Sequence, residues 1–143
     1  GTSANKGRDS AGRYVLKLLF SVELPIELKN GNAGRVKTWH QPATRRKKYE
    51  RTLRRLKLVR TPFEGAVVVH VTRILSKGQR LWDQSSGLAG NYKEIEDACT
   101  ACGWWKDDSP KYISEVRFFQ NDTRRAAGPA VLIEVFNNTS YCH

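Results

Sequence analysis

The chain has 143 residues and a formal net charge of +11, from 25 Lys and Arg against 14 Asp and Glu. One domain of this length can bury a core without disulfides, and the basic excess favours a polyanionic partner over a small-molecule substrate. No apolar run reaches the roughly 20 residues of a membrane span, and the odd count of three cysteines favours a reducing compartment such as the cytoplasm.

The chain begins with a polar segment that contains Gly and Ser. We expect residues 1–12 to be a flexible arm or an added remnant, ahead of one domain at 13–143. The segment 13–24 is apolar and rich in β-forming residues, which predicts a first strand that Pro25 ends. A loop rich in Gly and Asn follows at 29–37.

A first helix is predicted from Thr44 to Arg60, because Thr44 is a good N-cap and Pro62 lies beyond the end. Apolar residues recur in this segment at every third or fourth position. They should form one buried stripe made of Tyr49, Leu53, Leu56 and Val59.

The same helix is strongly basic. Residues 45–60 hold nine Lys and Arg against one acid, Glu50, so the segment carries +8 of the net charge of +11. Like charges at these spacings repel, and Arg45 and Arg46 in the first turn oppose the helix dipole by about 0.3–1 kcal/mol each. Contact with phosphates would offset this cost, so the pattern favours nucleic-acid binding over a merely solvated helix face.

The second half of the chain predicts one more helix and three more strands. Residues 67–75 are apolar on both faces, as in a central strand, and a loop follows at 76–91. Residues 92–102 should form a helix that Gly103 caps, with Ile95, Cys99 and Cys102 facing the core. The last two strands are predicted at 112–120 and 130–136, joined by a turn at 121–128. The order β-α-β-α-β-β predicts an α/β domain with one mixed sheet packed by helices.

Several residues that suggest chemistry are better explained by packing. Cys99 and Cys102 lie on the inner stripe of a helix, without the further ligands of a zinc site or the exposed helix start of a redox pair. Trp104 and Trp105 follow the helix-ending glycine and should pack back on the helix, although aromatic residues also stack on bases. His40 differs, because it lies in a loop just before the basic helix, where it is a candidate for substrate contact.

The segment 87–110 carries the strongest signal for a reaction. Lys93 and Asp97 are four residues apart and share one face of the predicted helix. Asp107 and Asp108 follow just past the helix end, where a carboxylate can reach a metal without entering the core. A lysine beside carboxylates presented by a loop and a helix end is typical of a site that cuts phosphodiesters.

Taken together, these residues resemble the RusA-type Holliday junction resolvases, above all the phage-borne members. The family places a lysine on a helix that ends in a Gly-aromatic turn followed by Asp-Asp. Here Lys93, Asp97-Ala98, the Gly-Trp-Trp turn at 103–105 and the Asp-Asp-Ser-Pro run at 107–110 fall at the family's relative spacing. The segment 34–56 is similar to the family's upstream loop and basic helix, and the resemblance extends over roughly residues 15–135.

The family also has a first acidic motif, Asp-x-Asp-Asn, in the loop before the lysine helix, and this sequence departs from it. Counted back from Lys93 without a gap, the Asp-x-Asp-Asn positions fall on Gln84, Ser85, Ser86 and Gly87, none of which is acidic. The nearest carboxylate is Asp83, which can serve if the loop holds one extra residue.

The resemblance implies a homodimeric endonuclease that cuts four-way DNA junctions with Mg²⁺, or with Mn²⁺ in its place, in the cytoplasm of a bacterium or a phage-infected cell. It assigns metal binding to Asp108 and Asp83, transition-state charge to Lys93, and an auxiliary role to Asp107. We expect DNA contacts from basic residues in the loops and the first helix: Arg35, Lys37, His40, Arg45, Arg46, Lys47, Lys48, Arg51, Arg80, Arg124 and Arg125.

Two alternatives share the basic helix. One is a catalytically silent relative that binds branched or duplex DNA, which the non-acidic run at 84–87 favours. The other is a general basic module that binds RNA. Binding to a junction, to a duplex and to a structured RNA at one salt concentration separates them.

Overall fold

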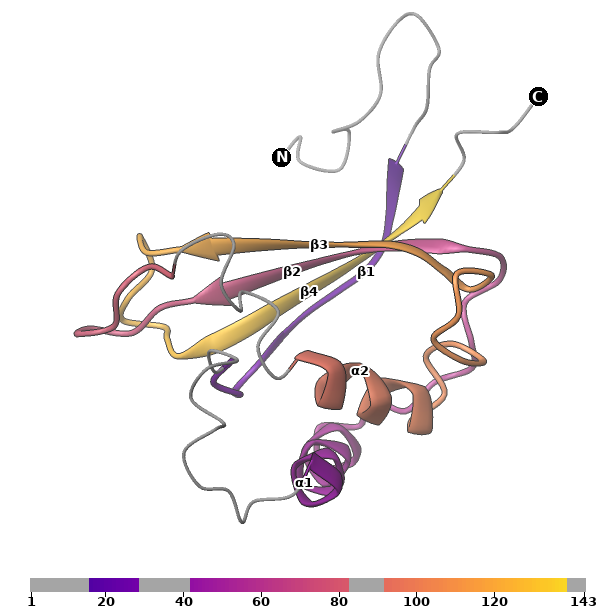
Figure 1. Ribbon diagram of the computed structural model, residues 1–143, viewed down its shortest axis with the longest axis horizontal. Coiled ribbons are helices and arrows are strands. Elements are labelled where there is room, and N and C mark those ends of the chain that lie inside the picture. Colours follow the sequence, from indigo (N-terminus) through magenta and orange to yellow (C-terminus); the bar gives the residue numbers. More distant parts are fainter. Residues whose placement is uncertain (1–15, 29–41, 83–91, 139–143) are drawn as a thin grey trace, which may run out of the picture.

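The computed structural model describes residues 16–28, 42–82 and 92–138. Its elements, in chain order, are β1 (Leu16–Leu24), α1 (Pro42–Arg55), β2 (Val67–Ile74), α2 (Tyr92–Ala101), β3 (Ile113–Asn121) and β4 (Ala130–Asn138). The α/β class, the mixed sheet and the order β-α-β-α-β-β are therefore confirmed (Figure 1).

One four-stranded sheet has the order β1-β4-β2-β3. β2 and β3 are parallel, whereas β4 runs antiparallel to both β1 and β2. β2 is central, as its apolar faces predicted, and all but one of its residues are buried. The last two strands are joined by a turn yet do not pair with each other, because β2 lies between them.

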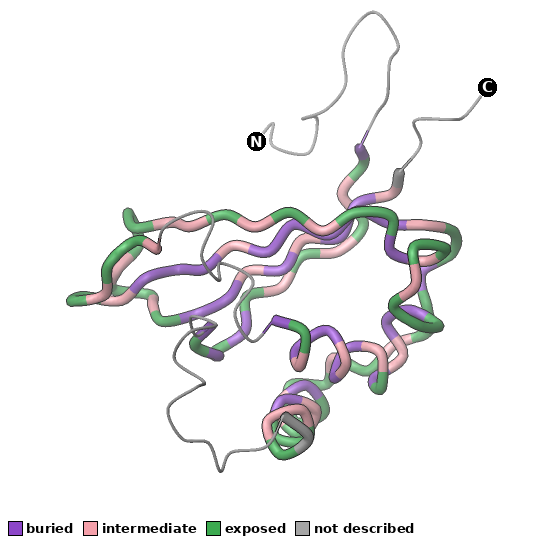
Figure 2. The backbone as a smooth tube through the Cα atoms, in the orientation of Figure 1, coloured by how far each residue is buried: buried purple, intermediate pink, exposed green. Residues whose placement is uncertain are grey.

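Both helices cover the same face of the sheet, and the main core lies between the helices and the sheet (Figures 1 and 2). Tyr49 and Leu53 of α1 and Ile95 of α2 enter this core, as the predicted stripes require. Among the helices that the structure describes, none combines the length and apolar character that crossing a bilayer requires.

The first helix is shorter than predicted, because α1 ends at Arg55 rather than Arg60. Lys57 adopts a left-handed backbone with φ 61°, and the Leu58 N–H donates to the Leu53 carbonyl at 2.9 Å. This is the hydrogen bond of a Schellman cap, formed here with lysine in the position that glycine usually takes. The predicted stripe consequently stops at Leu53, and Leu56 is 42% exposed.

Residues beyond α1 leave the helical path in order to cross the end of α2. The Arg60 N–H donates to the Cys102 carbonyl at 3.1 Å, and the Phe63 N–H donates to the Trp104 carbonyl at 3.0 Å. Val59 therefore lies outside any helix and is 49% exposed, contrary to its predicted place in the stripe. Sequence periodicity could not signal this ending, because the segment keeps its apolar spacing.

The end of α2 matches its prediction. Gly103 has φ 88°, and the Trp104 N–H donates to the Cys99 carbonyl at 3.0 Å. A Cβ atom on Gly103 would lie 2.3 Å from the Arg60 carbonyl oxygen, so the crossing segment leaves no room for a side chain. Trp104 is fully buried, and its indole N–H donates to the Leu58 carbonyl at 2.7 Å.

The predicted packing of the two cysteines is also confirmed. Cys99 and Cys102 are buried free thiols, and burial raises the pKa of both. His70 is buried on the other face of the sheet, with ring centroids 4.7 Å from Phe136 and 5.2 Å from Phe119.

Candidate active site and nucleic-acid interface

Lys93 lies in the first turn of α2 and meets carboxylates from two parts of the chain. Its Nζ atom lies 3.1 Å from Asp97 Oδ1 and 3.9 Å from Glu96 Oε2. It also donates to Asp108 Oδ2 from the segment that follows α2. We call these four residues the Lys93 cluster. The structure thus brings together Lys93 and Asp108, two of the predicted site residues, and adds Glu96, which its three-residue spacing from Lys93 could have revealed.

The fold explains why Asp108 reaches Lys93. The left-handed cap at Gly103 reverses the chain, so the segment after it returns along α2. A helix of 10 residues is about 15 Å long, and five residues of chain can span about 17 Å. Asp108 can therefore lie beside the first turn of the helix.

Exposure and charge suit this cluster to an ionic ligand. The Lys93 side chain is 58% exposed and that of Asp108 is 39% exposed. The hydrogen bond that Lys93 donates to Asp108, followed by the one that it donates to Asp97, raises the pKa of Lys93 and holds it in the charged ammonium form. Burial raises the pKa of Glu96, and the neighbouring carboxylates Asp108 and Asp97 add to this effect while Lys93 opposes it.

Asp107 has a different environment. Its Oδ1 atom accepts a hydrogen bond from the Ser109 backbone N–H at 2.8 Å, which lowers the pKa of Asp107. Such a turn fixes the backbone on either side of Asp108. Asp107 therefore helps to position Asp108, and its auxiliary catalytic role stays a prediction.

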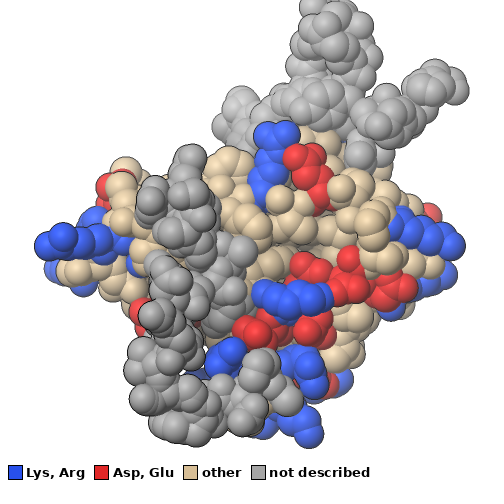
Figure 3. All heavy atoms as spheres, viewed as in Figure 1, with Lys and Arg blue, Asp and Glu red and all other residues tan. Residues whose placement is uncertain are grey.

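An ion pair joins the start of the basic helix to the start of α2. Arg45 Nη2 of α1 lies 3.5 Å from Glu94 Oε2. Figure 3 shows acidic side chains gathered with basic ones over α2, and further basic side chains over α1. The Lys93 cluster is therefore bordered by the predicted DNA-binding helix.

The outer face of α1 offers unpaired positive charge. Lys47, Lys48 and Arg51 are exposed, and within the described ranges their side chains make no hydrogen bond or ion pair. Arg54 pairs with Glu50 at 2.8 Å, whereas Arg46 is half-buried. A row of unpaired cations on one helix face can bind phosphates without first breaking internal contacts.

Three further predicted DNA contacts lie near the carboxyl ends of β2 and β3, in the two connections at that edge of the sheet (Figure 1). Arg80 is exposed. Arg124 pairs with Glu23 at 2.9 Å. Arg125 Nη1 donates to the carbonyls of residues 76 and 79, so it also holds the connection after β2 in place.

A buried arginine fixes the end of that connection. Arg73 is 4% exposed, and its Nη1 donates to the Arg80 carbonyl at 3.0 Å and to Gln120 Oε1 at 2.8 Å. Its guanidinium stacks over the Trp82 ring at 3.8 Å, and the Gln120 side chain bonds both backbone groups of Trp82. Burial lowers the pKa of Arg73, and nearby Arg125 adds to this effect. Trp82 directly precedes Asp83, so this contact sets where the Asp83 loop begins.

Part of the predicted site lies outside the described residues. This is true of Asp83, of the run at 84–87, and of Arg35, Lys37 and His40. Within the described ranges, no three His, Cys, Asp or Glu side chains are arranged to hold a metal ion. A ligand pair of Asp108 and Asp83 for Mg²⁺ stays a prediction.

Two comparisons, with family models and with curated proteins, give no relative. No family model matches the sequence, and no curated protein gives a significant match. The resemblance to RusA-type resolvases therefore depends on the motif residues themselves.

Proposed function

We propose that this chain is a RusA-type, structure-selective endonuclease that cuts four-way DNA junctions. The contact between Lys93 and Asp108 gives the most support, because the resemblance assigns the catalytic cation and a metal ligand to these two residues. They are 15 residues apart in sequence and meet on an accessible surface beside a basic helix.

In this proposal the described residues bind and orient the DNA. Lys47, Lys48 and Arg51 hold the backbone phosphates, which brings a scissile phosphate toward the Lys93 cluster. The Lys93 ammonium offsets negative charge that develops on the phosphate oxygens. Mg²⁺, held by Asp108 and Asp83 with substrate phosphate and water as further ligands, would supply an activated water. A homodimer would present two such sites to a two-fold junction.

Variants at the two contacting residues test the proposal. Asp108→Asn and Lys93→Met should each lower Mg²⁺-dependent junction cleavage by about 100-fold or more, which is typical for the loss of a charge-stabilising group. Asp122→Asn is the matched control, because Asp122 is exposed and outside the Lys93 cluster. Junction binding in EDTA and the unfolding temperature should be measured for all three proteins. If Asp108→Asn cut as fast as the parent, this assignment would be wrong.

A second candidate follows from the run Gln84-Ser85-Ser86-Gly87, which offers no carboxylate. In this case the protein binds branched DNA without cutting it. The parent chain would then bind junctions tightly in EDTA and give no product in Mg²⁺ or Mn²⁺. Binding by Asp108→Asn would match that of the parent, because phosphate contacts from α1 would carry the affinity.

A further inference from the structure

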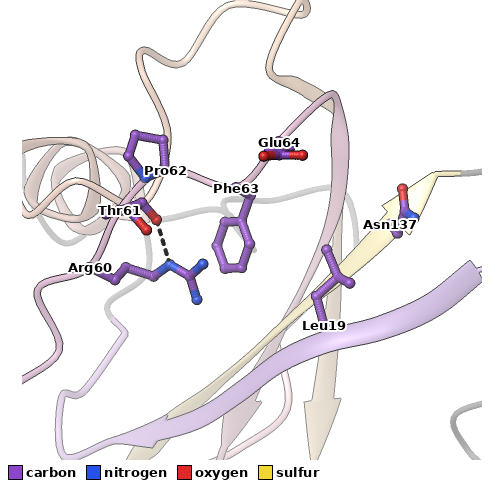
Figure 4. Close-up of a pocket in the computed structure, with 7 residues that line it drawn as sticks. All are labelled: Leu19, Arg60, Thr61, Pro62, Phe63, Glu64 and Asn137. Atoms are coloured by element: carbon purple, nitrogen blue, oxygen red, sulfur yellow. Dashed lines mark hydrogen bonds between the residues drawn. The ribbon is translucent and has the colours of Figure 1, made fainter.

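A surface cavity of about 500 Å³ lies between β1, the crossing segment after α1, and the end of β4 (Figure 4). Leu19 and Phe63 supply apolar walls, and Arg60 and Glu64 supply charge. Small-molecule and side-chain pockets typically have 300–1,000 Å³. None of the candidate active-site residues lines this cavity.

Arg60 is held rigidly in this pocket. Its Nε atom donates to the Thr61 carbonyl at 2.8 Å, and its guanidinium carbon lies 3.7 Å from the centre of the Phe63 ring and 5.5 Å from that of Phe20. Within the described part of the chain, its terminal nitrogens have no acceptor. Figure 4 shows them turned away from Thr61. A fixed guanidinium with free terminal N–H groups is suited to bidentate binding of an anion.

The surroundings select the type of anion. Glu64 lines the same pocket and would repel a second negative charge, so a carboxylate fits better than a dianionic phosphate. Leu19 is 41% exposed and Phe63 forms the opposite wall, so the group that carries the carboxylate should be apolar.

The pocket adjoins an open strand edge. β1 pairs with β4 on one side, and no strand of the described ranges pairs with its other edge. The register with β4 is interrupted between Leu18 and Phe20 and is continuous from Phe20 to Leu24. An added strand could pair along residues 20–24 and would have to stop at the irregularity, where Leu19 and the pocket begin.

We propose that this site binds the carboxyl terminus of an extended segment of a partner protein. The segment adds to β1 in the antiparallel direction along residues 20–24. Its last side chain, which is apolar, lies against Leu19 and Phe63, and its terminal carboxylate accepts two hydrogen bonds from Arg60. Backbone pairing supplies general affinity, and the pocket selects a free apolar terminus.

The test uses two pools of N-acetylated hexapeptides whose last residue is Leu, Ile, Val or Phe. One pool ends in the free acid and the other in the amide, and binding is followed by ¹⁵N NMR of the whole chain. The acid pool should shift the Arg60 side-chain and Leu19 amide signals and bind about tenfold or more tightly than the amide pool. Arg60→Gln should remove this preference, whereas Arg55→Gln, an exposed control, should keep it.

A second variant keeps the test valid if Arg60→Gln fails to fold. Leu19→Glu places a negative charge at an exposed position of the pocket and should weaken the acid pool about tenfold or more. The proposal would be overturned by equal binding of the two pools, by no binding of the acid pool, or by inorganic phosphate shifting the Arg60 signals where the acid pool does not.

Discussion

Lys93 shares its positive charge among three carboxylates, and Asp108 makes the closest contact. The position of Lys93 and its partner Asp97 could be predicted from helix spacing alone. The contact with Asp108 was implied by motif spacing, and it depends physically on the chain reversal at Gly103. Glu96 was not predicted as part of the site, because the family motif has no acidic residue at this position. Its side chain nevertheless reaches the same lysine.

The pKa of Lys93 should depend on Asp108. Asp108→Asn removes the largest cause of its raised pKa, so Lys93 should lose its proton at a lower pH in the variant than in the parent. Because the folded pKa is raised, the contact stabilises the fold below the ordinary lysine value and is lost as pH rises through the folded value. ¹³Cε NMR of labelled lysine across pH 8–12 measures this, and identical titration in both proteins would contradict the cluster.

Glu96 gives a second prediction, with the same direction of pH dependence but at lower pH and with burial as its cause. The folded chain binds a proton at Glu96 more readily than the unfolded chain, since burial raises its pKa above 4.5. Stability should therefore fall as pH rises from about 4.5 through the folded value. Glu96→Gln removes this loss, so its free energy of unfolding relative to the parent should increase from pH 4 to pH 8. Urea unfolding at several pH values tests this, and a constant difference would be inconsistent with it.

At the scale of elements, the two helices end in the same way with different residues. α2 has Gly103 in the left-handed position, and α1 has Lys57. The glycine made the end of α2 predictable, whereas a lysine gives no such signal, so the predicted first helix ran on to Arg60. The order of the strands in the sheet could not be predicted either, because the sequence has no local signal for it. Hydrophobic pattern identifies strands and marks β2 as central, but it does not say that β4 inserts between β1 and β2.

Lys57→Gly should stabilise the protein. A left-handed backbone costs an L-residue about 1–2 kcal/mol, and glycine avoids most of this while losing some entropy in the unfolded chain. We expect a net gain of about 0.5–1 kcal/mol in the free energy of unfolding, measured by chemical denaturation. Lys57 is exposed, so no packing is lost.

Gly103→Ala is the counterpart at the other helix end. It combines a left-handed alanine with a Cβ atom 2.3 Å from the Arg60 carbonyl oxygen. The expected loss is about 2–3 kcal/mol, because the crossing segment must shift. If Lys57→Gly destabilised the protein or Gly103→Ala had no effect, the description of the helix ends would be wrong.

At the scale of the whole molecule, the excess of 11 positive charges is concentrated by the fold. Both helices lie on one side of the sheet, and basic side chains of α1 lie beside the mixed charges over α2, where Arg45 pairs with Glu94 (Figures 1 and 3). The sequence predicted the basic helix, and nucleic acid as its partner stays a prediction. The acidic motif expected near Asp83 is altered in this sequence, and residues 83–91 lie outside the described ranges.

Replacing Lys47, Lys48 and Arg51 together by alanine should weaken junction binding and reduce its salt dependence. Each phosphate contact contributes about 0.9 to the slope of log K against log salt on duplex DNA, so the slope should fall by up to about 2.7. Arg117→Ala is the control, because Arg117 lies on β3 and is paired with Glu115. Filter binding across 50–300 mM salt gives both slopes, and an unchanged slope in the triple variant would exclude α1 as the main phosphate contact.

The most direct test of the proposed function follows the parent protein on an end-labelled four-way junction, first in EDTA and then in Mg²⁺ or Mn²⁺. We expect the protein to bind the junction more tightly than a duplex of the same arms at equal salt. We further expect metal-dependent nicks at symmetry-related positions in opposite strands. Equal affinity for junction and duplex, with no cut in either metal, would contradict the proposed function.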